Sequence, residues 1–551
     1  MQPVQPATLW RSALWLTAVG GVLPLLITWR FGALGIPRND DWSFLIASFR
    51  FADGGGIDGN GWAMMNLVGQ LVIALPVNVV FGNRIAPLQA LVAGFGVVGL
   101  VAVYDLSRHW LTHRRALFGA TLLAAGPLWA ALAGSFMTDL PMFALCMICL
   151  AAGARALDAD RRSTGWLAVA LVAGFAGFAI RQYALVAVVA VMLGGVWHGA
   201  RLGRRRLVVV VALCAATVGA AAVFYLWRLG LPGFDDPPLQ VPTRPLIAAG
   251  IDRGLRAAIL VGLLAFPALV VVGVPRTIVA AGRRSLGFAV VPAGGLMVAF
   301  GFWAERKYRT DLSSMISPGN YVRSGGILGT DVIAGVRPDL LPRSLMTVLV
   351  LLGMVSAVVA FGAATSTIPA FVRSIVRGGR GGSPARTVTI LALLGFGVAS
   401  AAPVFLGMPL FDRYLLPVIA TTVVLLLGAP VDGWAPSRGD RWAAGVAVAG
   451  LTAVGLVFSC NAASFDGARW RAAERAAQFT GDVGRIDGGF EWINYHAGRA
   501  VFFTPEREAP RYCVRLVSSP DRVPGWNDVA EPVWGPFGTQ AWIVAEQRVP
   551  C

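Results

Sequence analysis

Long apolar segments recur along most of this chain, and they constrain its fold more than any other feature. Each is about 17–25 residues long, the length that crosses a lipid bilayer as a helix. The chain is 56% hydrophobic and only 14% charged, a balance that soluble domains do not need. We therefore predict an all-α polytopic membrane protein with about thirteen transmembrane helices. The predicted segments lie near residues 9–29, 84–106, 116–134, 140–157, 164–180, 183–199, 207–228, 254–274, 286–302, 343–365, 387–406, 414–430 and 443–460.

The segment 62–81 decides which loops share a side of the membrane. It is long enough to cross, but Asn66, Gln70 and Pro76 interrupt it. If it does not cross, the arginine clusters between later helices lie on the same side as the N-terminus, as the positive-inside rule expects of the cytoplasm. We therefore interpret this segment as re-entrant or interfacial. The clusters lie within residues 108–115, 155–162, 201–206, 276–284 and 373–386.

The formal net charge of +17 has the same topological explanation, because arginines carry nearly all of it. The alternative is a dedicated basic patch that binds nucleic acid or lipid headgroups. We expect membrane lipid as a partner and no nucleic acid.

The hydrophilic stretch 461–551 is predicted to be a small extracytoplasmic α+β domain that follows a membrane domain of residues 1–460. Outside the cytoplasm, Cys513 and Cys551 could form a disulfide, with Cys460 as an alternative partner.

The first outer loop, residues 30–83, carries the motif Arg38-Asn39-Asp40-Asp41-Trp42. Adjacent carboxylates at a membrane boundary are costly unless they face water or do chemistry. The apolar residues that follow have the i, i+3, i+4, i+7 spacing of an amphipathic helix that lies on the outer leaflet. We predict that one aspartate of the pair is a catalytic base. The alternative is that Asp40 or Asp41 only caps this interfacial helix.

Two short turns between apolar segments carry further polar residues on the same predicted face. The first is Ser135-Phe-Met-Thr-Asp139, in which Asp139 is either a functional acid or a cap for the next helix. The second is Arg181-Gln182. The guanidinium of Arg181 either extends to the membrane surface or grips a phosphate, whose oxygens match its planar fork.

The remaining outer-face cations come from two later regions. Arg413 follows Asp412 at the beginning of an apolar segment, and the long loop 303–342 contains Arg306 and Lys307. Positive charge on this face departs from the positive-inside rule and suits an anionic partner such as a lipid-linked phosphate. Carboxylates beside such cations fit the transfer of a group from a lipid phosphate to a hydroxyl or amine, since a carboxylate deprotonates the acceptor and cations stabilise the departing phosphate.

The order and topology of these motifs resemble the GT-C superfamily of integral-membrane glycosyltransferases, in particular bacterial relatives of protein O-mannosyltransferases and of lipid A aminoarabinose transferase. The motif that contains Asp40 and Asp41 resembles the acidic pair of the family's first outer loop, whose first member is usually the catalytic base. Asp139 is similar to the acidic position of the second outer loop. One departure is that Trp42-Ser43 stands where the aminoarabinose transferases have a basic residue.

Two later motifs extend the resemblance. Arg181-Gln182 is similar to an Arg-Gln pair of some dolichol-dependent glucosyltransferases, and Asp412-Arg413-Tyr414-Leu415-Leu416-Pro417 is similar to an arginine–tyrosine signature of many members. Gly488-Gly489-Phe490-Glu491-Trp492 also looks familiar, without a known role.

The resemblance implies an inverting hexosyl- or pentosyltransferase in the bacterial plasma membrane, active on the extracytoplasmic face. It implies a polyprenyl-phosphate-linked sugar donor and a lipid, glycan or protein acceptor. Loop 303–342 would close over the donor. Whether a divalent cation binds stays open; if one does, Asp40 and Asp139 are its expected ligands.

The alternative function is a transporter or lipid flippase, which would need charged or broken mid-membrane helices and often repeated halves. The implied catalytic residues are Asp40, Asp41 and Asp139, and the implied phosphate-binding residues are Arg181, Gln182, Arg306, Lys307 and Arg413.

Overall fold

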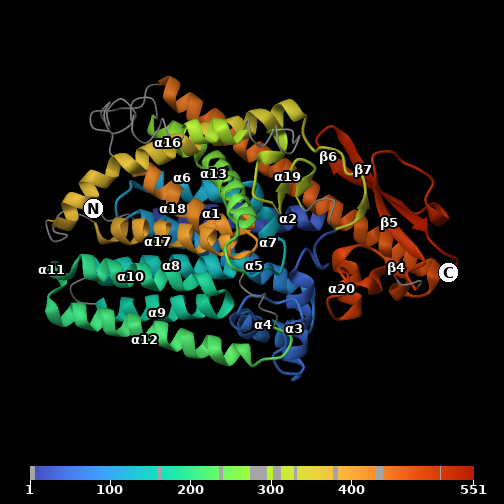
Figure 1. The fold of residues 1–551 in the computed structure, drawn as a ribbon, viewed down its shortest axis with the longest axis horizontal. Helices are drawn as coiled ribbons and strands as arrows, with labels where there is room; N and C mark the ends of the chain where they lie inside the picture. Colours follow the sequence, from blue (N-terminus) through green and yellow to red (C-terminus); the bar gives the residue numbers. More distant parts are fainter. Residues whose placement is uncertain are drawn as a thin grey trace.

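The computed structural model describes residues 6–158, 163–234, 240–273, 294–301, 312–319, 321–327, 332–376, 383–428, 438–508 and 511–551. A helical bundle forms most of the molecule, and a small sheet lies beyond one end of it (Figure 1). The N-terminus lies at the opposite end from the C-terminus (Figure 1). The helices are α1 (Pro6–Thr17), α2 (Leu23–Arg30), α3 (Asp41–Ala52), α4 (Val68–Phe81), α5 (Ile85–Ser107), α6 (His113–Ala125), α7 (Pro127–Ala133), α8 (Asp139–Asp158), α9 (Ser163–Ile180), α10 (Leu185–Trp197), α11 (Gly199–Leu202), α12 (Arg204–Leu229), α13 (Arg244–Val272), α16 (Arg343–Val376), α17 (Pro384–Ala401), α18 (Leu416–Leu427), α19 (Arg438–Thr480) and α20 (Phe490–Ala497).

The described residues contain eight helices that are long and apolar enough to cross a membrane, or nine if the bent pair α6–α7 counts as one span. The chain is therefore a multi-pass membrane protein, but the predicted thirteen spans are not reached. Every predicted segment coincides with a helix; of 286–302 only residues 294–301 are described, and these are helical. The number differs because polar or bent breaks shorten several helices. One break turns the chain by 71° between α6 and α7, and the apolar stretches Thr164–Ile180 and Gln182–Trp197 are each shorter than 18 residues.

The segment predicted to be re-entrant or interfacial forms α4, a helix of 14 residues. Its length is below that of a typical spanning helix. Val79 and Val80 are each 72% exposed at its end, whereas Gln70 and Asn78 face the protein and are buried. The polar interruptions therefore pack inward, and the interfacial interpretation stays a prediction.

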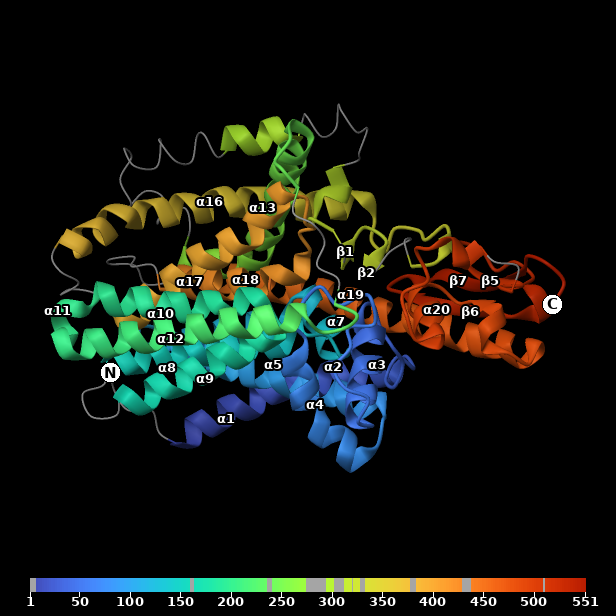
Figure 2. The same ribbon diagram turned by 60° about the horizontal axis from the view of Figure 1, so that its bottom comes forward.

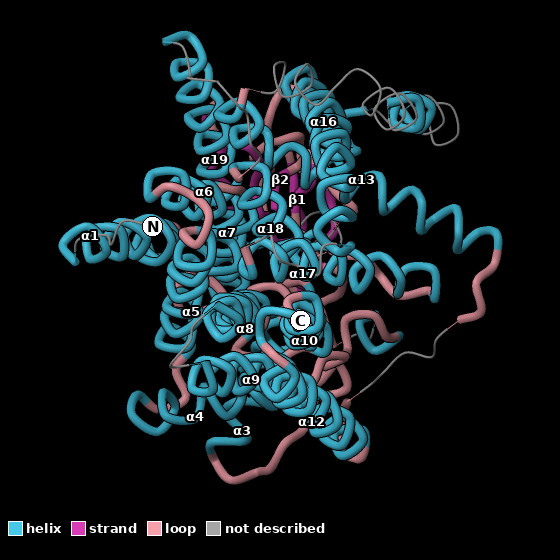
Figure 3. Tube along the Cα trace, turned by 90° about the vertical axis from the view of Figure 1, so that its left-hand side faces the viewer, coloured by secondary structure: helices cyan, strands magenta, loops and turns pink. Residues whose placement is uncertain are grey.

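Helix α8 is at the centre of the bundle, where it contacts α5, α9, α10 and α17. A view along the bundle shows these helices around it (Figure 3). Asp139 begins α8 and Arg155 lies in its last turn. Since sixteen residues of α-helix rise about 24 Å, the predicted acid and the arginine cluster lie at opposite ends of the bundle.

The C-terminal sheet has the order β3 (Ala334–Gly335), β5 (Val514–Ser519), β7 (Gly538–Gln547) and β6 (Ala530–Gly535), and β4 (Ile486–Asp487) also pairs with β5. Strands β5, β7 and β6 are antiparallel, whereas β3 and β4 run parallel to β5. Strand β3 comes from the long loop 303–342, so this part of the loop belongs to the C-terminal unit. A separate hairpin pairs β1 (Val322–Arg323) with β2 (Gly326–Ile327).

Helix α19 connects the two parts of the molecule. It is continuous over 43 residues, so it passes through the predicted domain boundary at residue 460 without a break. Its C-terminal part packs against the sheet and supplies Phe465, Trp470 and Ala476 to a second hydrophobic core. Figure 2 shows α19 leading from the bundle toward α20 and the sheet. The helical and sheet-containing parts are therefore joined by a rigid element rather than by a linker.

A disulfide joins Cys513 to Cys551, and Cys460 is free. The bond closes a loop across 38 positions of sequence and ties the C-terminus to β5.

Replacing both Cys513 and Cys551 by serine should destabilise the sheet-containing unit by up to about 4 kcal/mol, because the unfolded chain regains the freedom of that loop. Differential scanning fluorimetry of the purified full chain, with and without reductant, measures the effect. Cys460→Ser is the matched control and should leave the transition unchanged. An equal shift in all variants would contradict a stabilising role for this bond.

Candidate functional site

The Asp40-Asp41 pair stands where the first outer loop enters α3. Asn39 has a positive φ of 56°, which turns the backbone sharply just before the pair. Asp41 is fully buried, and its two carboxylate oxygens accept hydrogen bonds from the backbone N–H groups of Arg38 and Phe136, the latter at 2.9 Å. Burial raises the pKa of Asp41. Asp41 thus fastens the first loop to the segment before α8, and its catalytic role stays a prediction.

Asp40 makes two contacts of opposite character. One carboxylate oxygen accepts a hydrogen bond from the indole Nε1 of Trp62 at 3.0 Å, and the other accepts one from Nη2 of Arg413 at 2.6 Å. Its side chain keeps 12% of its surface exposed. Asp40 makes no side-chain capping bond to α3, so the capping interpretation does not apply to it. Trp62 had no signal of its own in the sequence.

Arg413 lies in a short 3-10 helix, η5 (Asp412–Leu415), and is 2% exposed. Its Nη2 binds Asp40, whereas Nε and Nη1 have no hydrogen-bond partner within the described part of the chain. The neighbouring Asp412 is buried and accepts hydrogen bonds from the backbone N–H groups of Tyr321 and Val322. Burial raises the pKa of Asp412 to about 6. Asp412 therefore anchors the loop before β1, while Arg413 faces the site.

The predicted acid of the second turn pairs with the predicted arginine of the third. Nη2 of Arg181 lies 3.3 Å from Oδ2 of Asp139, and Nε of Arg181 donates to the hydroxyl of Thr138. Both side chains are buried, and Oδ1 of Asp139 has no partner among the described residues. The guanidinium of Arg181 lies 4.9 Å from the centre of the Tyr414 ring.

Tyr414 joins the two ion pairs into one site. The guanidinium of Arg413 lies 5.5 Å from the same ring that Arg181 covers. The ring of Tyr183 lies 5.9 Å from it, and the Tyr183 hydroxyl also lacks a partner in the described ranges. Two arginines, each paired with one aspartate, therefore surround a tyrosine, and several buried polar atoms there have unused hydrogen-bonding capacity.

A second buried network holds the first loop from the C-terminal side. Arg38 binds Asp466 of α19 at 2.7 Å, and the backbone N–H of Asn39 donates to Glu491 of α20 at 2.8 Å. Glu491 also pairs with Arg469 of α19, and burial raises the pKa of Glu491. The familiar-looking motif around Glu491 was the only signal of this role in the sequence.

Gly134 explains why Arg38 can reach α19. Its carbonyl accepts a hydrogen bond from Nη1 of Arg38 at 3.1 Å. A Cβ at this position would come within 2.2 Å of the Thr28 hydroxyl and 2.8 Å of the Arg38 guanidinium. Only glycine permits this approach.

The other predicted residues lie elsewhere. The amide of Gln182 donates to the backbone carbonyl of Met64 at 2.9 Å, a contact that positions the loop before α4. Arg306 and Lys307 lie outside the described residues. Within the described ranges, no group of three or more histidine, cysteine, aspartate or glutamate side chains could hold a metal ion.

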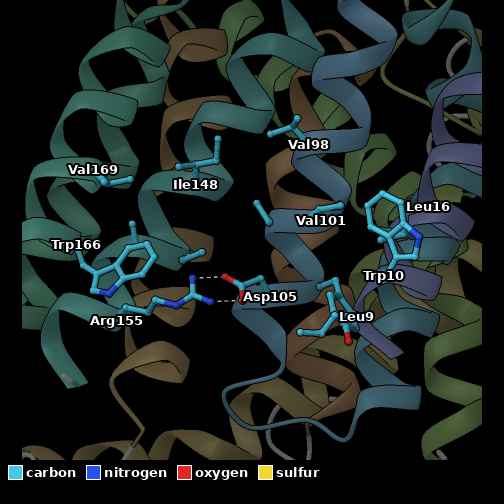
Figure 4. A pocket seen from close by; sticks show the side chains of 15 residues that line it. Leu9, Trp10, Leu16, Val98, Val101, Asp105, Ile148, Arg155, Trp166 and Val169 are labelled. Atoms are coloured by element: carbon cyan, nitrogen blue, oxygen red, sulfur yellow. Dashed lines mark hydrogen bonds and ion pairs between the residues drawn. The ribbon is translucent and has the colours of Figure 1, made fainter. Parts of the chain in front are cut away.

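A separate groove of about 580 Å³ lies near the other end of the bundle, between α1, α5, α8 and α9. Its lining is apolar apart from Asp105 and Arg155, which form an ion pair (Figure 4). The guanidinium of Arg155 lies 4.8 Å from the centre of the Trp166 ring. This groove does not belong to the acidic site. Its one acid, Asp105, is paired with Arg155, and about 24 Å of α8 separates the groove from Asp139.

Glu491→Gln should destabilise the protein by roughly 3–5 kcal/mol, because it takes the closer of two carboxylates from the buried Arg469, whose other partner Asp466 lies 3.7 Å away, and so weakens the network that holds the first loop. The apparent melting temperature and the rate of proteolysis within residues 30–40 measure this effect. The control is Glu531→Gln, since Glu531 pairs with the exposed Arg471 and Arg475 and should cost less than about 1 kcal/mol. Equal effects of the two variants would contradict the anchoring role of Glu491.

Comparison with known proteins gives one family match and several similar structures. Residues 67–227 match the family model PMT_2, described as dolichyl-phosphate-mannose-protein mannosyltransferase. This range runs from the beginning of α4 to the end of α12 and contains Asp139 and Arg181, but neither Asp40 nor Arg413. No curated protein sequence matches the chain significantly.

Two proteins are among the similar solved structures. The archaeal oligosaccharyltransferase AglB from Archaeoglobus fulgidus, in complex with an inhibitory peptide and a dolichol-phosphate, has 16% identity and a TM-score of 0.45 over 91% of this chain. The present chain spans 64% of the length of that protein. ArnT from Cupriavidus metallidurans in the apo state has 15% identity and a TM-score of 0.40, over 98% of each chain. Its structure bound to undecaprenyl phosphate has 14% identity and a TM-score of 0.38, over 97% of each chain.

Proposed function

From the match of residues 67–227 to the PMT_2 family model, we propose that the chain is a GT-C membrane glycosyltransferase that uses a polyprenyl-phosphate-linked sugar as donor. It transfers the sugar to an acceptor outside the cytoplasm. Asp40 is the general base, and Arg413 and Arg181 bind the donor phosphate.

The observation that carries this proposal is the placement of Arg413. Its guanidinium holds Asp40 through one nitrogen and keeps two buried donors, Nε and Nη1, without a partner in the described ranges. Buried donors normally have partners, and a guanidinium fork matches phosphate oxygens. The guanidinium of Arg181 lies beside the same Tyr414 ring as that of Arg413. A phosphate between the two arginines would lie next to the carboxylate that accepts the proton.

The chemical step follows from this arrangement. Asp40 takes the proton of the acceptor hydroxyl, and the oxygen attacks the anomeric carbon of the donor sugar from the face opposite the phosphate. The bond between the anomeric carbon and the phosphate oxygen breaks, and the polyprenyl phosphate leaves with the electron pair. Arg413 and Arg181 stabilise the charge that develops on that oxygen. Attack from the opposite face inverts the anomeric configuration.

The sidedness of the site supports an extracytoplasmic reaction. Asp40, Asp139, Arg181 and Arg413 share the end of the bundle next to the C-terminal sheet, whereas Arg155 lies at the other end. The Cys513–Cys551 disulfide in that sheet-containing unit is typical of compartments outside the cytoplasm. Loop 303–342 contributes Tyr321 and Val322 to the support of Asp412, which fits the proposed closure of this loop over the donor.

Asp40→Asn should reduce transfer roughly 100- to 10,000-fold, because the amide cannot accept the acceptor proton. Transfer of labelled sugar from the polyprenyl-phosphate donor to membrane acceptors measures the change. Asp53→Asn, at the exposed end of α3, is the matched control and should retain activity. Full activity of the Asp40 variant, at normal expression, would exclude Asp40 as the base.

Arg413→Lys should weaken binding of undecaprenyl phosphate about 10- to 100-fold, because lysine cannot hold Asp40 and a phosphate through one planar fork. Native mass spectrometry of the protein in nanodiscs with added undecaprenyl phosphate measures the affinity. Arg30→Lys at the exposed end of α2 is the control. Unchanged binding in the Arg413 variant would place the phosphate elsewhere.

A further inference from the structure

A small pocket is lined by Trp62, whose indole donates a hydrogen bond to Asp40. It has a volume of about 210 Å³ and is lined by both the first outer loop and the C-terminal unit. Ligand pockets of drug-sized molecules are usually about 300–1,000 Å³, so this one suits a single ring. Its lining residues are Gly61, Trp62, Met64, Asn494, Ala500, Phe502, Phe503 and Thr504.

The walls of this pocket are aromatic. The rings of Trp62 and Phe503 are stacked, with centroids 6.1 Å apart and an interplanar angle of 16°. Phe490 lies behind them, 5.3 Å from Trp62 and 5.7 Å from Phe503. Phe503 is nevertheless 68% exposed, which is unusual for so large an apolar side chain. The aromatic surface is therefore held in place by the protein but is accessible from outside.

One polar group in the lining has an unused donor. Asn494 is 1% exposed, and its Oδ1 accepts hydrogen bonds from the backbone N–H groups of Val501 and Phe502 at 2.7 and 2.9 Å. These two bonds fix the orientation of the amide, and its Nδ2 has no partner among the residues that the structure describes. A buried amide donor without a partner suits a ligand oxygen. The Thr504 hydroxyl donates to the Val501 carbonyl and can accept another bond.

None of the eight lining residues is charged. The pocket thus differs from the arginine side of Asp40 and offers no positive charge to a phosphate or a carboxylate. An aromatic face, one amide donor and one hydroxyl suit a ring that has both a C–H face and hydroxyl groups. Those are the features of a neutral sugar.

We propose that this pocket is the acceptor subsite and that it binds a neutral sugar ring, so the acceptor is a glycan or glycolipid. The inference rests on the proposed glycosyltransferase function. The sugar packs against Trp62 and Phe503, and Asn494 donates to one of its hydroxyls. Trp62 contacts both the pocket and Asp40, so a second hydroxyl of the same sugar can approach the carboxylate from the side opposite Arg413. Donor and acceptor then reach Asp40 from different directions.

Saturation-transfer NMR on the full chain in nanodiscs, with methyl α-mannopyranoside and methyl β-galactopyranoside as probes, tests the subsite. Signals from the sugar ring should be seen with the unmodified protein. Phe503→Ala should weaken binding about fivefold, the effect of removing one aromatic contact. Asn494→Asp should also weaken it, because it keeps the acceptor for the Val501 and Phe502 N–H groups and removes the donor. Phe537→Ala, at an 81% exposed position of the same unit, is the matched control and should leave binding unchanged.

Two outcomes would overturn the subsite. One is sugar binding that is absent, or equal in the Phe503, Asn494 and Phe537 variants. The other is Phe503-dependent binding of a neutral threonine peptide instead of the sugars, which would make the acceptor a protein.

Asp40→Asn separates this inference from the proposed function. Transfer that persists in this variant, with sugar binding intact, removes Asp40 as the base but keeps the subsite. Loss of transfer without any sugar binding removes only the subsite.

Discussion

The ion pair between Asp40 and Arg413 joins residues that are 373 positions apart, and the geometry of the site depends on it. Both side chains are buried at the edge of a membrane bundle, where an isolated charge is costly. The pair offsets that cost only because other groups hold each partner. Trp62 binds the second oxygen of Asp40, and Asp412 anchors the backbone beside Arg413 to the loop before β1. The charges are therefore fixed in position before any substrate arrives, as electrostatic catalysis requires.

The C-terminal unit is part of the site. Asp466 and Glu491 bind the loop that precedes Asp40, and the continuous helix α19 carries this support from the bundle to the sheet. The same unit supplies Asn494 and Phe503 to the pocket beside Trp62. A change in this unit can thus reach the proposed base through α19 and the first outer loop.

The two sides of Asp40 differ in chemistry, and this difference gives the proposed reaction its direction. Arg413 binds one oxygen of Asp40, and Trp62, which binds the other, belongs to a pocket of uncharged aromatic and amide groups. An anionic donor is attracted to the first side and meets no opposite charge on the second. A neutral acceptor has the opposite preference. The site thus distinguishes donor from acceptor both by the attractive contacts on each side and by the absence of contacts for the wrong substrate.

Much of the fold could be predicted from the sequence, because membrane helices satisfy their backbone hydrogen bonds locally and must be apolar over a defined length. Most predicted segments are helices, but α9, α10 and the α6–α7 pair are shortened or bent, and these breaks depend on neighbours rather than on local hydropathy. The position of α19 across the expected boundary at residue 460 has the same cause, since polar residues continue a helix once the sheet packs against it.

The sequence by itself determined that acids and arginines occur in the outer turns, since polar residues in short breaks between apolar segments have few other places to lie. Only the tertiary structure decided which of them meet. Asp40 pairs with Arg413, and Asp139 pairs with Arg181. Asp41 and Gln182 bind backbone groups instead. Trp62 and Glu491, which were not predicted to be site residues, bind Asp40 and the loop before it. The physical reason is that hydrophobic periodicity specifies each helix separately, whereas the partners of a buried charge are set by how the helices and the C-terminal unit pack together.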